Sequence, residues 1–382
     1  MRAWIPTIAV VTCYLALAPG CKDERSRPGP DAAKVTSPRA APVRVVVSTE
    51  PRHRPRLTLV PGLPGTPRPQ PQRVGSLHLT AERCHLEGAT FLSTRQDPAL
   101  RAVEVLGRHL YAIDHRGAVL RFSVAPTPRC RLRLDKSWGT AGVHRSRLDL
   151  ERLTVDGHGT LIASSYLGSL VVREGRVAYP CRARHQGHVA LHPTGGWGLA
   201  GYSGSDVHRL VFGPTSCTGA VWHLTALRDD ARRRGPFRLV SALGFQGDTI
   251  LVGGSLALRV QGWHPHVAVA FDEQGRRRFQ LGALTGSGPE RLGWIRSIGA
   301  CGSQRICVVD GTLRRLTLWD TKGRFLGAAS MPDLLGVTTP WLTNLAVASP
   351  DRVYLAAGPG GTQAGMSEGT IFRVGGLAGS TP

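Results

Sequence analysis

From about residue 100 onward, short apolar runs alternate with tight polar turns. A typical unit has a short apolar strand, a polar turn, a stronger apolar strand, a second turn and a further strand, as in 101–124. Short runs bounded by Gly, Pro, Asp and Ser are typical of strands. Long apolar stripes with helical spacing are not apparent in the sequence. The pattern therefore predicts an all-β fold.

The unit recurs in six copies at a spacing of roughly 40–55 residues, the period of propeller blades. The copies are 101–124, 151–172, 188–212, 241–260 with an outer strand at 267–281, 296–327, and 344–376. One blade cannot bury both faces of its sheet, whereas a ring of blades can. We therefore expect a six-bladed β-propeller over 76–382, closed by a strand near 76–79 or 89–93. Seven blades remain an alternative, and no recurring Trp-Asp signature favours the WD type.

The fifth copy carries the clearest motif. Its run Ile306-CVVDGTLRRLTLWDTKGRFLG resembles NHL-repeat and related TolB-like six-bladed propellers, in which a strand ending in Asp precedes a turn, an Arg-led strand and a D-x-x-G hairpin. Asp156-Gly157-His158-Gly159 in the second copy is similar. Copies one, three and four depart more from the motif. The resemblance implies the fold and leaves the activity open.

The first residues have the pattern of an export signal. Arg2 precedes a nearly apolar run, and residues 1–20 read as a signal peptide. The boundary at Cys21 resembles the bacterial lipobox, which implies a lipidated Cys21, although Ala18 and Pro19 depart from the usual residues there. Lys22 stands where Asp would mark inner-membrane retention, so the outer membrane is favoured. An ordinary cleaved signal and an uncleaved anchor are the alternatives.

Residues 21–75 are rich in Pro, Arg, Ala and Ser and hold only short apolar runs. Such a segment buries too little apolar surface to offset the entropy of ordering. We expect a disordered tether between the lipid and the folded part, and hence a cell-envelope location with the folded domain in the periplasm or at the cell surface.

The formal charge of +22 raises the possibility of a nucleic-acid partner. Of the 48 basic residues only four are Lys, and the chain has a single Asn, a bias that a GC-rich genome produces. No nucleic-acid-binding motif is recognisable. We therefore expect a solvated basic surface, no nucleic-acid partner and a monomer.

Six cysteines follow Cys21, an even number that predicts disulfides in an exported chain. The repeat map selects three pairs: Cys84 with Cys130, Cys181 with Cys217, and Cys301 with Cys307. Metal binding by these thiols is the alternative, but no C-x-x-C pair is present.

Gluconolactonase-like and regucalcin-like propellers share this architecture and hold a divalent cation in the channel through acidic and Asn side chains just before the innermost strands. The equivalent positions here are Arg101, Glu151, 187–188, Ser241, Arg296 and 343–344. Only Glu151 is acidic, and the arginines oppose a cation. The channel mouth therefore suits an anionic or polar ligand, with no metal and no cofactor.

Several further side chains are candidates for the channel mouth. Trp294 and Trp341 precede innermost strands, where they form either an aromatic shelf or core wedges between blades. His188 and His192 would share a strand face and His185 would point away, so a metal site there needs a ligand from elsewhere. The full set of candidate channel-mouth residues is Arg101, Glu151, His188, Trp294, Arg296, Trp341 and Asn344.

No motif of a common enzyme class is recognisable, and no catalytic residue is assigned. We predict a tethered binding or scaffold module for an envelope protein or polysaccharide. The alternative is a propeller hydrolase or lactonase with Glu151, His188 and Arg296 near its active channel. A third possibility is a basic surface that holds anionic polymer.

Overall fold

The computed structural model separates a first part of the chain, Met1–Arg68, from a compact second unit, Pro69–Pro382. It describes residues 77–377 apart from 78, 92–99, 147, 166–167, 182–186, 202–206, 214–215, 223–236, 258, 261–262, 286–287, 337–339 and 360–368. All of the described residues belong to the second unit. The predicted signal peptide, Cys21 and the tether lie outside them.

The described part of the chain is all-β, as the apolar pattern predicted. It contains strands and one short helix, α1 (Met331–Leu335), which Ser330 caps through its side chain. No described helix has both the length and the apolar character needed to span a bilayer.

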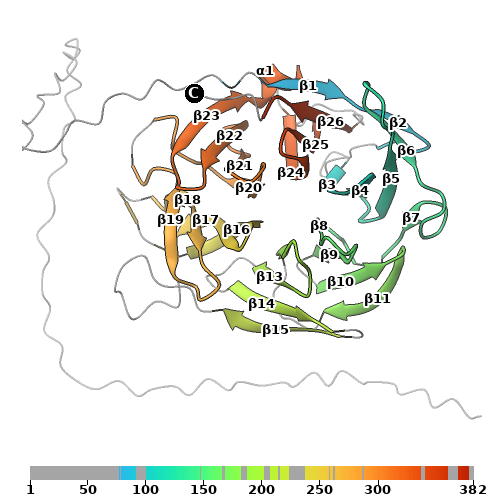
Figure 1. Ribbon diagram of the computed structural model, residues 1–382, viewed down its shortest axis with the longest axis horizontal. Coiled ribbons are helices and arrows are strands. Elements are labelled where there is room, and N and C mark those ends of the chain that lie inside the picture. Colours follow the sequence, from blue (N-terminus) through green and yellow to red (C-terminus); the bar gives the residue numbers. More distant parts are fainter. Residues whose placement is uncertain are drawn as a thin grey trace, which may run out of the picture. The chain divides into compact units, whose positions relative to one another are not determined.

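Two sheets are simple four-stranded antiparallel meanders, coloured yellow to orange in Figure 1. One contains β16 (Phe237–Gln246), β17 (Thr249–Leu256), β18 (His266–Phe271) and β19 (Arg277–Leu281). The next contains β20 (Ile295–Ala300), β21 (Arg305–Asp310), β22 (Arg315–Asp320) and β23 (Phe325–Ser330). In each, the strands neighbour one another in chain order, as the fourth and fifth repeats predicted.

The second and third repeats form two further meanders. One runs through β8 (Arg152–Val155), β9 (Leu161–Ser165), β10 (Gly168–Arg173) and β11 (Arg176–Cys181), and the other through β12 (His188–Leu191), β13 (Trp197–Gly201), β14 (Val207–Phe212) and β15 (Cys217–Trp222). Their outer strands β11 and β15 meet in parallel at Cys181 and Cys217, which joins the two meanders into one eight-stranded sheet.

The first and last repeats complete the set. The first contains β3 (Leu100–Leu106), β4 (His109–Asp114), β5 (Val119–Val124) and β6 (Arg131–Leu134), with β2 (His85–Glu87) parallel to β6 and β7 (Val143–His144) beside β5. The last contains β24 (Pro340–Ser349), β25 (Arg352–Pro359) and β26 (Thr370–Gly375), to which the early strand β1 (Thr80–Arg83) adds an antiparallel edge. A strand from the start of the unit thus completes the last sheet, as expected, although it begins just after the predicted 76–79.

The first strand of each repeat lies innermost, and these strands surround a common centre in Figure 1. Each contacts the next, from β3 through β8, β12, β16, β20 and β24 back to β3. Side chains bond neighbouring inner strands: the Leu191 N–H donates to Thr154 Oγ1 at 3.2 Å, and the Leu345 N–H donates to Ser297 Oγ at 3.1 Å. These bonds satisfy backbone groups where no ladder exists between the sheets.

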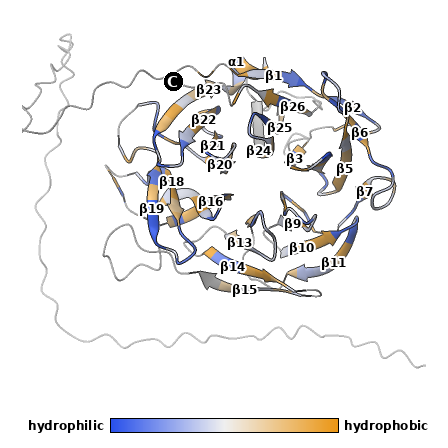
Figure 2. Ribbon diagram, viewed as in Figure 1, coloured by the Kyte–Doolittle hydropathy of each residue, from blue (hydrophilic) through white to orange (hydrophobic). Residues whose placement is uncertain are grey.

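The apolar core lies between neighbouring sheets. Leu199 and Val207 of the third repeat pack in one buried cluster with Val252 of the fourth, and Ala268 of the fourth packs with Ile306 of the fifth. The outer strand β19 is visibly more hydrophilic than β18 in Figure 2. Burial of both sheet faces in the middle and exposure at the outer edge explain the strong apolar runs of the middle strands.

A single turn type connects many of the strands. Asp114, Asp156, Asp272 and Asp320 each accept, through Oδ1, the N–H groups two and four residues later, at distances of 2.8–3.0 Å. The glycine three residues after each aspartate has a positive φ of 72–84°, a conformation that other residues rarely adopt. The D-x-x-G motif of the sequence therefore has a local physical cause.

All three predicted disulfides are present: Cys84–Cys130, Cys181–Cys217 and Cys301–Cys307. The repeat map placed Cys181 and Cys217 around one blade, whereas the bond links the outer strands of two neighbouring repeats. The sequence pattern could not reveal this, because the second repeat was predicted to end at residue 172, which left Cys181 of β11 outside it.

Candidate functional site

A cavity of about 330 Å³ follows the inner strands, and all six of them contribute to its lining. Most of its wall is formed by apolar residues and glycines of these strands, including Ala242, Gly244 and Ile298. The ionisable side chains stand out against this background. They are Glu104 from β3, Arg152 and Asp156 from the β8 hairpin, His188 from β12, and Arg296 from β20.

Arg152 and Arg296 are the electrostatic centre of the cavity. Burial and then the positive charge of Arg296 lower the pKa of Arg152 to about 10, against the opposing effect of Glu151. Burial lowers the pKa of Arg296 as well. Arginine keeps its charge at neutral pH, so two positive charges lie in the same partly desolvated cavity. Within the described residues, the buried Nε of Arg152 has no hydrogen-bond partner.

His188 adds a neutral imidazole to this site. Burial, followed by the charges of Arg152 and Arg296, holds the pKa of His188 well below its ordinary value. A ring that cannot gain a proton at neutral pH offers one hydrogen-bond donor and one acceptor to a ligand. The three side chains together suit an anion that also carries polar groups.

Glu104 lines the cavity from β3. Burial raises its pKa to about 8, although the Val105 N–H donates to its Oε1 at 3.1 Å and opposes the shift. At neutral pH most of this carboxyl is therefore protonated and acts as a hydrogen-bond donor as well as an acceptor.

The structure brings together some of the predicted channel-mouth residues. His188, Arg296 and Asn344 line the cavity, whereas Arg101, Glu151 and Trp294 are not among its lining residues. Trp341 lies at the start of β24, but its side chain lies outside the described residues. The cavity also takes residues from the far ends of the inner strands, so it extends along them rather than forming a mouth alone.

Three of the predicted channel-mouth residues have partners elsewhere in the fold. Arg101 pairs with Asp149, and the Trp294 ring packs on His266 of the neighbouring sheet with centroids 5.7 Å apart. Asn344 lines the cavity, yet its amide bridges two inner strands, since Oδ1 accepts from the Val103 N–H at 2.8 Å and Nδ2 donates to Val103 O. Asn344 therefore holds β24 to β3.

Sequence reasoning missed Glu104 and Arg152. Glu104 is the one acidic residue in the largely apolar run LRAVEVL, and an acidic side chain in a buried strand was the available signal. Arg152 directly follows Glu151, and the assignment of the second repeat was one residue early. The three histidines also separate: His188 faces the cavity, His192 lies in the turn after β12, and His185 is outside the described residues.

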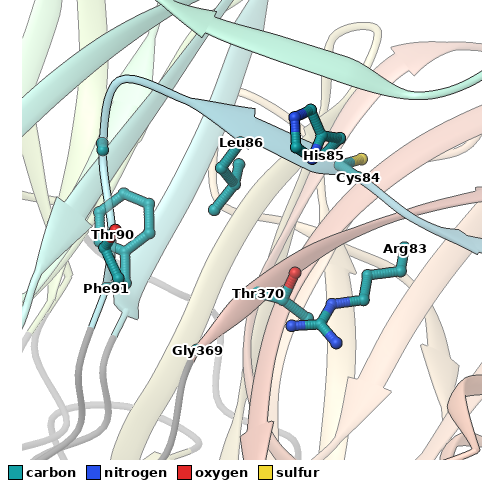
Figure 3. Close-up of a pocket in the computed structure, with 9 residues that line it drawn as sticks. Arg83, Cys84, His85, Leu86, Thr90, Phe91, Gly369 and Thr370 are labelled. Atoms are coloured by element: carbon teal, nitrogen blue, oxygen red, sulfur yellow. The ribbon is translucent and has the colours of Figure 1, made fainter.

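A second cavity, of about 360 Å³, lies beside the early strands β1 and β2. In Figure 3, Arg83 and Thr370 lie on one side of it, and Leu86 and Phe91 on the other. Two of its walls continue in sequence into 92–99 and 360–368, which are outside the described residues, and we assign it no function. Comparison with known proteins finds no matching family model and no matching curated protein.

Proposed function

We propose that this protein is an exported binding or scaffold module, tethered to the membrane through a lipid on Cys21, whose folded part is a six-bladed β-propeller. The closed succession of six inner strands, the cores between neighbouring sheets and the early strand that completes the last sheet support the propeller. The recurring D-x-x-G turns support the NHL-repeat or TolB-like type. Three disulfides support an oxidising compartment, consistent with an envelope location in which the outer membrane is favoured.

The pair of half-buried arginines in the cavity is the observation that supports a binding function. Two like charges in a desolvated site cost folding free energy. An anionic group beside Arg152 and Arg296 would gain charge-assisted hydrogen bonds. We infer that the cavity receives a carboxylate or similar anion displayed by an envelope protein or polysaccharide.

The test uses two defined probes, a galacturonate oligomer and a glutamate-rich peptide, titrated calorimetrically against the protein. We expect one of them to bind the wild type, and the double variant Arg152→Gln/Arg296→Gln to bind it at least about tenfold more weakly, since each charged hydrogen bond contributes ~1.5–3 kcal/mol. The same variant should unfold at higher denaturant than the ligand-free wild type, because the repulsion is removed.

The matched control is Arg277→Gln/Arg278→Gln, which removes two charges from the exposed strand β19. It should bind the probe as the wild type does. Equal losses in both double variants, with a steep dependence on salt, would instead assign the binding to the basic surface as a whole. Failure of the wild type to bind either probe would contradict the proposed anion site.

Glu104 and His188 favour a second candidate function, a hydrolase or lactonase working in the same cavity. A protonated carboxyl and a neutral imidazole are a suitable acid and base at neutral pH. Here Glu104 takes the part that the sequence assigned to Glu151. Turnover of a lactone or ester probe that disappears in Glu104→Gln and persists in Glu151→Gln would establish the enzyme; no turnover by the wild type would leave the binding module.

A further inference from the structure

His192 lies in the turn between β12 and β13, outside the set of residues that line the cavity. Its turn, His192-Pro193-Thr194-Gly195, has the form of the D-x-x-G turns, with Gly195 at a φ of 77° and the Gly195 N–H donating to His192 O at 2.9 Å. An imidazole thus occupies the position that an aspartate holds in the second repeat. Only 4% of its surface is exposed.

The orientation of this ring is fixed on three sides. It stacks on Trp197 with centroids 4.5 Å apart and meets the edge of Phe245 at 5.1 Å. Its Nδ1 lies 2.7 Å from Thr194 Oγ1. The Thr194 N–H also approaches Nδ1, at 3.4 Å. In the tautomer whose Nδ1–H donates to the Thr194 hydroxyl, the lone pair is on Nε2. Among the described residues, the buried Nε2 has no hydrogen-bond partner.

Two carboxylates from the neighbouring sheet lie close to this imidazole. Asp248 is in the β16–β17 turn and Glu273 in the β18–β19 turn, both at exposed positions. The Nε2 to Asp248 Oδ1 distance is 3.7 Å, and one ligand atom from each of the three residues lies within 4.8 Å of the others. A separation of 3.7 Å is too long for a hydrogen bond.

The separation does fit two ligands of one metal ion. Two atoms each about 2.1 Å from a tetrahedral Zn²⁺ lie about 3.4 Å apart, so a small closure of the turns would complete the site. The donors are one imidazole and two carboxylates, a mixture that suits Zn²⁺ or Mn²⁺ better than Ca²⁺, which takes oxygen ligands. The Thr194 hydroxyl would supply the outer contact that fixes the tautomer of a metal-bound histidine.

We propose that His192, Asp248 and Glu273 bind a divalent transition-metal ion, with Zn²⁺ as the best match, and that the ion cross-links the third and fourth repeats. The fourth coordination position faces solvent, since both carboxylates are exposed. The proposal is independent of the anion site in the cavity, because the two sites share no residue.

The test titrates Zn²⁺ into chelator-treated protein and, in parallel, into Asp248→Asn and Glu273→Gln. Both changes lie at exposed positions and should leave the fold intact. We expect one site of higher affinity in the wild type, weakened at least about tenfold in either variant, and a rise of Tm with Zn²⁺ that the variants lack. Ca²⁺ should not reproduce this rise.

Two matched controls are Asp351→Asn, in the equivalent turn between β24 and β25, and Glu290→Gln, at another exposed position. Both should bind Zn²⁺ as the wild type does. Co²⁺ loaded into the wild type should give the visible absorption of a four-coordinate site with a nitrogen ligand, and His192→Asn, which can keep the turn, should change that spectrum. Wild-type affinity in Asp248→Asn and Glu273→Gln, or the absence of a specific site in the wild type, overturns the proposal.

Discussion

At the residue scale, the inner strands give ordinary side chains unusual properties. Glu104 is the clearest case, because burial raises its pKa to about 8 in the folded protein while the unfolded chain retains a pKa near the ordinary value of 4.5. Between these two values the unfolded state has released a proton that the folded state keeps. Folding stability should therefore be greatest below about pH 4.5 as far as this group is concerned, fall as the pH rises, and level off above about pH 8.

This gives a test by urea unfolding between about pH 5 and pH 8. The contribution of Glu104 should lower the free energy of unfolding by at most about 1.4 kcal/mol per pH unit. Glu104→Gln should remove that slope and be more stable than the wild type at about pH 8, while the exposed control Glu174→Gln should keep the wild-type slope. Parallel profiles for wild type and Glu104→Gln would show that the carboxyl ionises freely inside the folded protein.

The alignment of single residue positions determined which parts of the candidate site were predictable from the sequence. Arg296 and His188 were found because a repeat alignment places equivalent positions of the inner strands. The second repeat was set one residue early, and neighbouring residues of a strand point to opposite faces, so Glu151 was chosen instead of Arg152. Packing partners were not predictable, since the contacts of Trp294 with His266 and of Asn344 with Val103 join residues from different repeats.

At the element scale, turns and disulfides determine how the strands meet. The aspartates of the D-x-x-G turns bond to backbone groups within a few residues of themselves, which is why the hairpins could be predicted from sequence. The joining of β11 to β15 is different in kind. It rests on one parallel pairing, the disulfide between Cys181 and Cys217, and a hydrogen bond from the Tyr179 hydroxyl to Gly213 O. No local pattern encodes a contact between the outer edges of two repeats.

The disulfide that joins two repeats and the disulfide within one hairpin should therefore differ in their effect on stability. Cys181–Cys217 closes a sequence separation of 36 residues and Cys301–Cys307 one of 6. On the chain-entropy argument, their removal costs about 4 and about 2 kcal/mol respectively. Denaturant unfolding of Cys181→Ala/Cys217→Ala and of Cys301→Ala/Cys307→Ala measures both. A larger loss for the second pair would mean that local strain or packing, and not loop closure, dominates.

At the scale of the whole molecule, the sequence predicted the all-β character and the order of strands within each repeat well, because each repeat is a local unit with its own apolar runs and turns. The completion of the last repeat was harder to predict. The structure completes it with β1, whose residues are distant in sequence from the strand they pair with: Thr80 lies opposite Gly375 and Arg83 opposite Phe372. The alternating apolar pattern of 76–83 is too short to identify that partner.

Polar contacts reinforce this closure. Glu82 accepts the Cys130 N–H at 2.7 Å and pairs with Arg373 of β26, which also donates to Pro128 O. The backbone bond from Cys130 and the nearby Arg373 lower the pKa of Glu82. Stability from this group should be present above its ordinary pKa and be lost as the pH falls through the lowered folded value.

Removal of β1 tests the closure directly. A protein truncated to begin at Cys84 loses the β1–β26 ladder together with Leu77, Leu79 and Ala81, which pack on the core of the last sheet. We expect a loss of at least about 3 kcal/mol in the free energy of unfolding, whereas a protein that begins at Leu77 should match the full chain.

Hydrogen exchange locates the effect: amides of β25 and β26 should lose protection first, while those of β16 to β19 keep it. If both truncated proteins are equally stable, β1 merely covers an edge that the other sheets already hold in place. Loss of protection in every sheet at once would mean instead that all repeats depend on this one pairing.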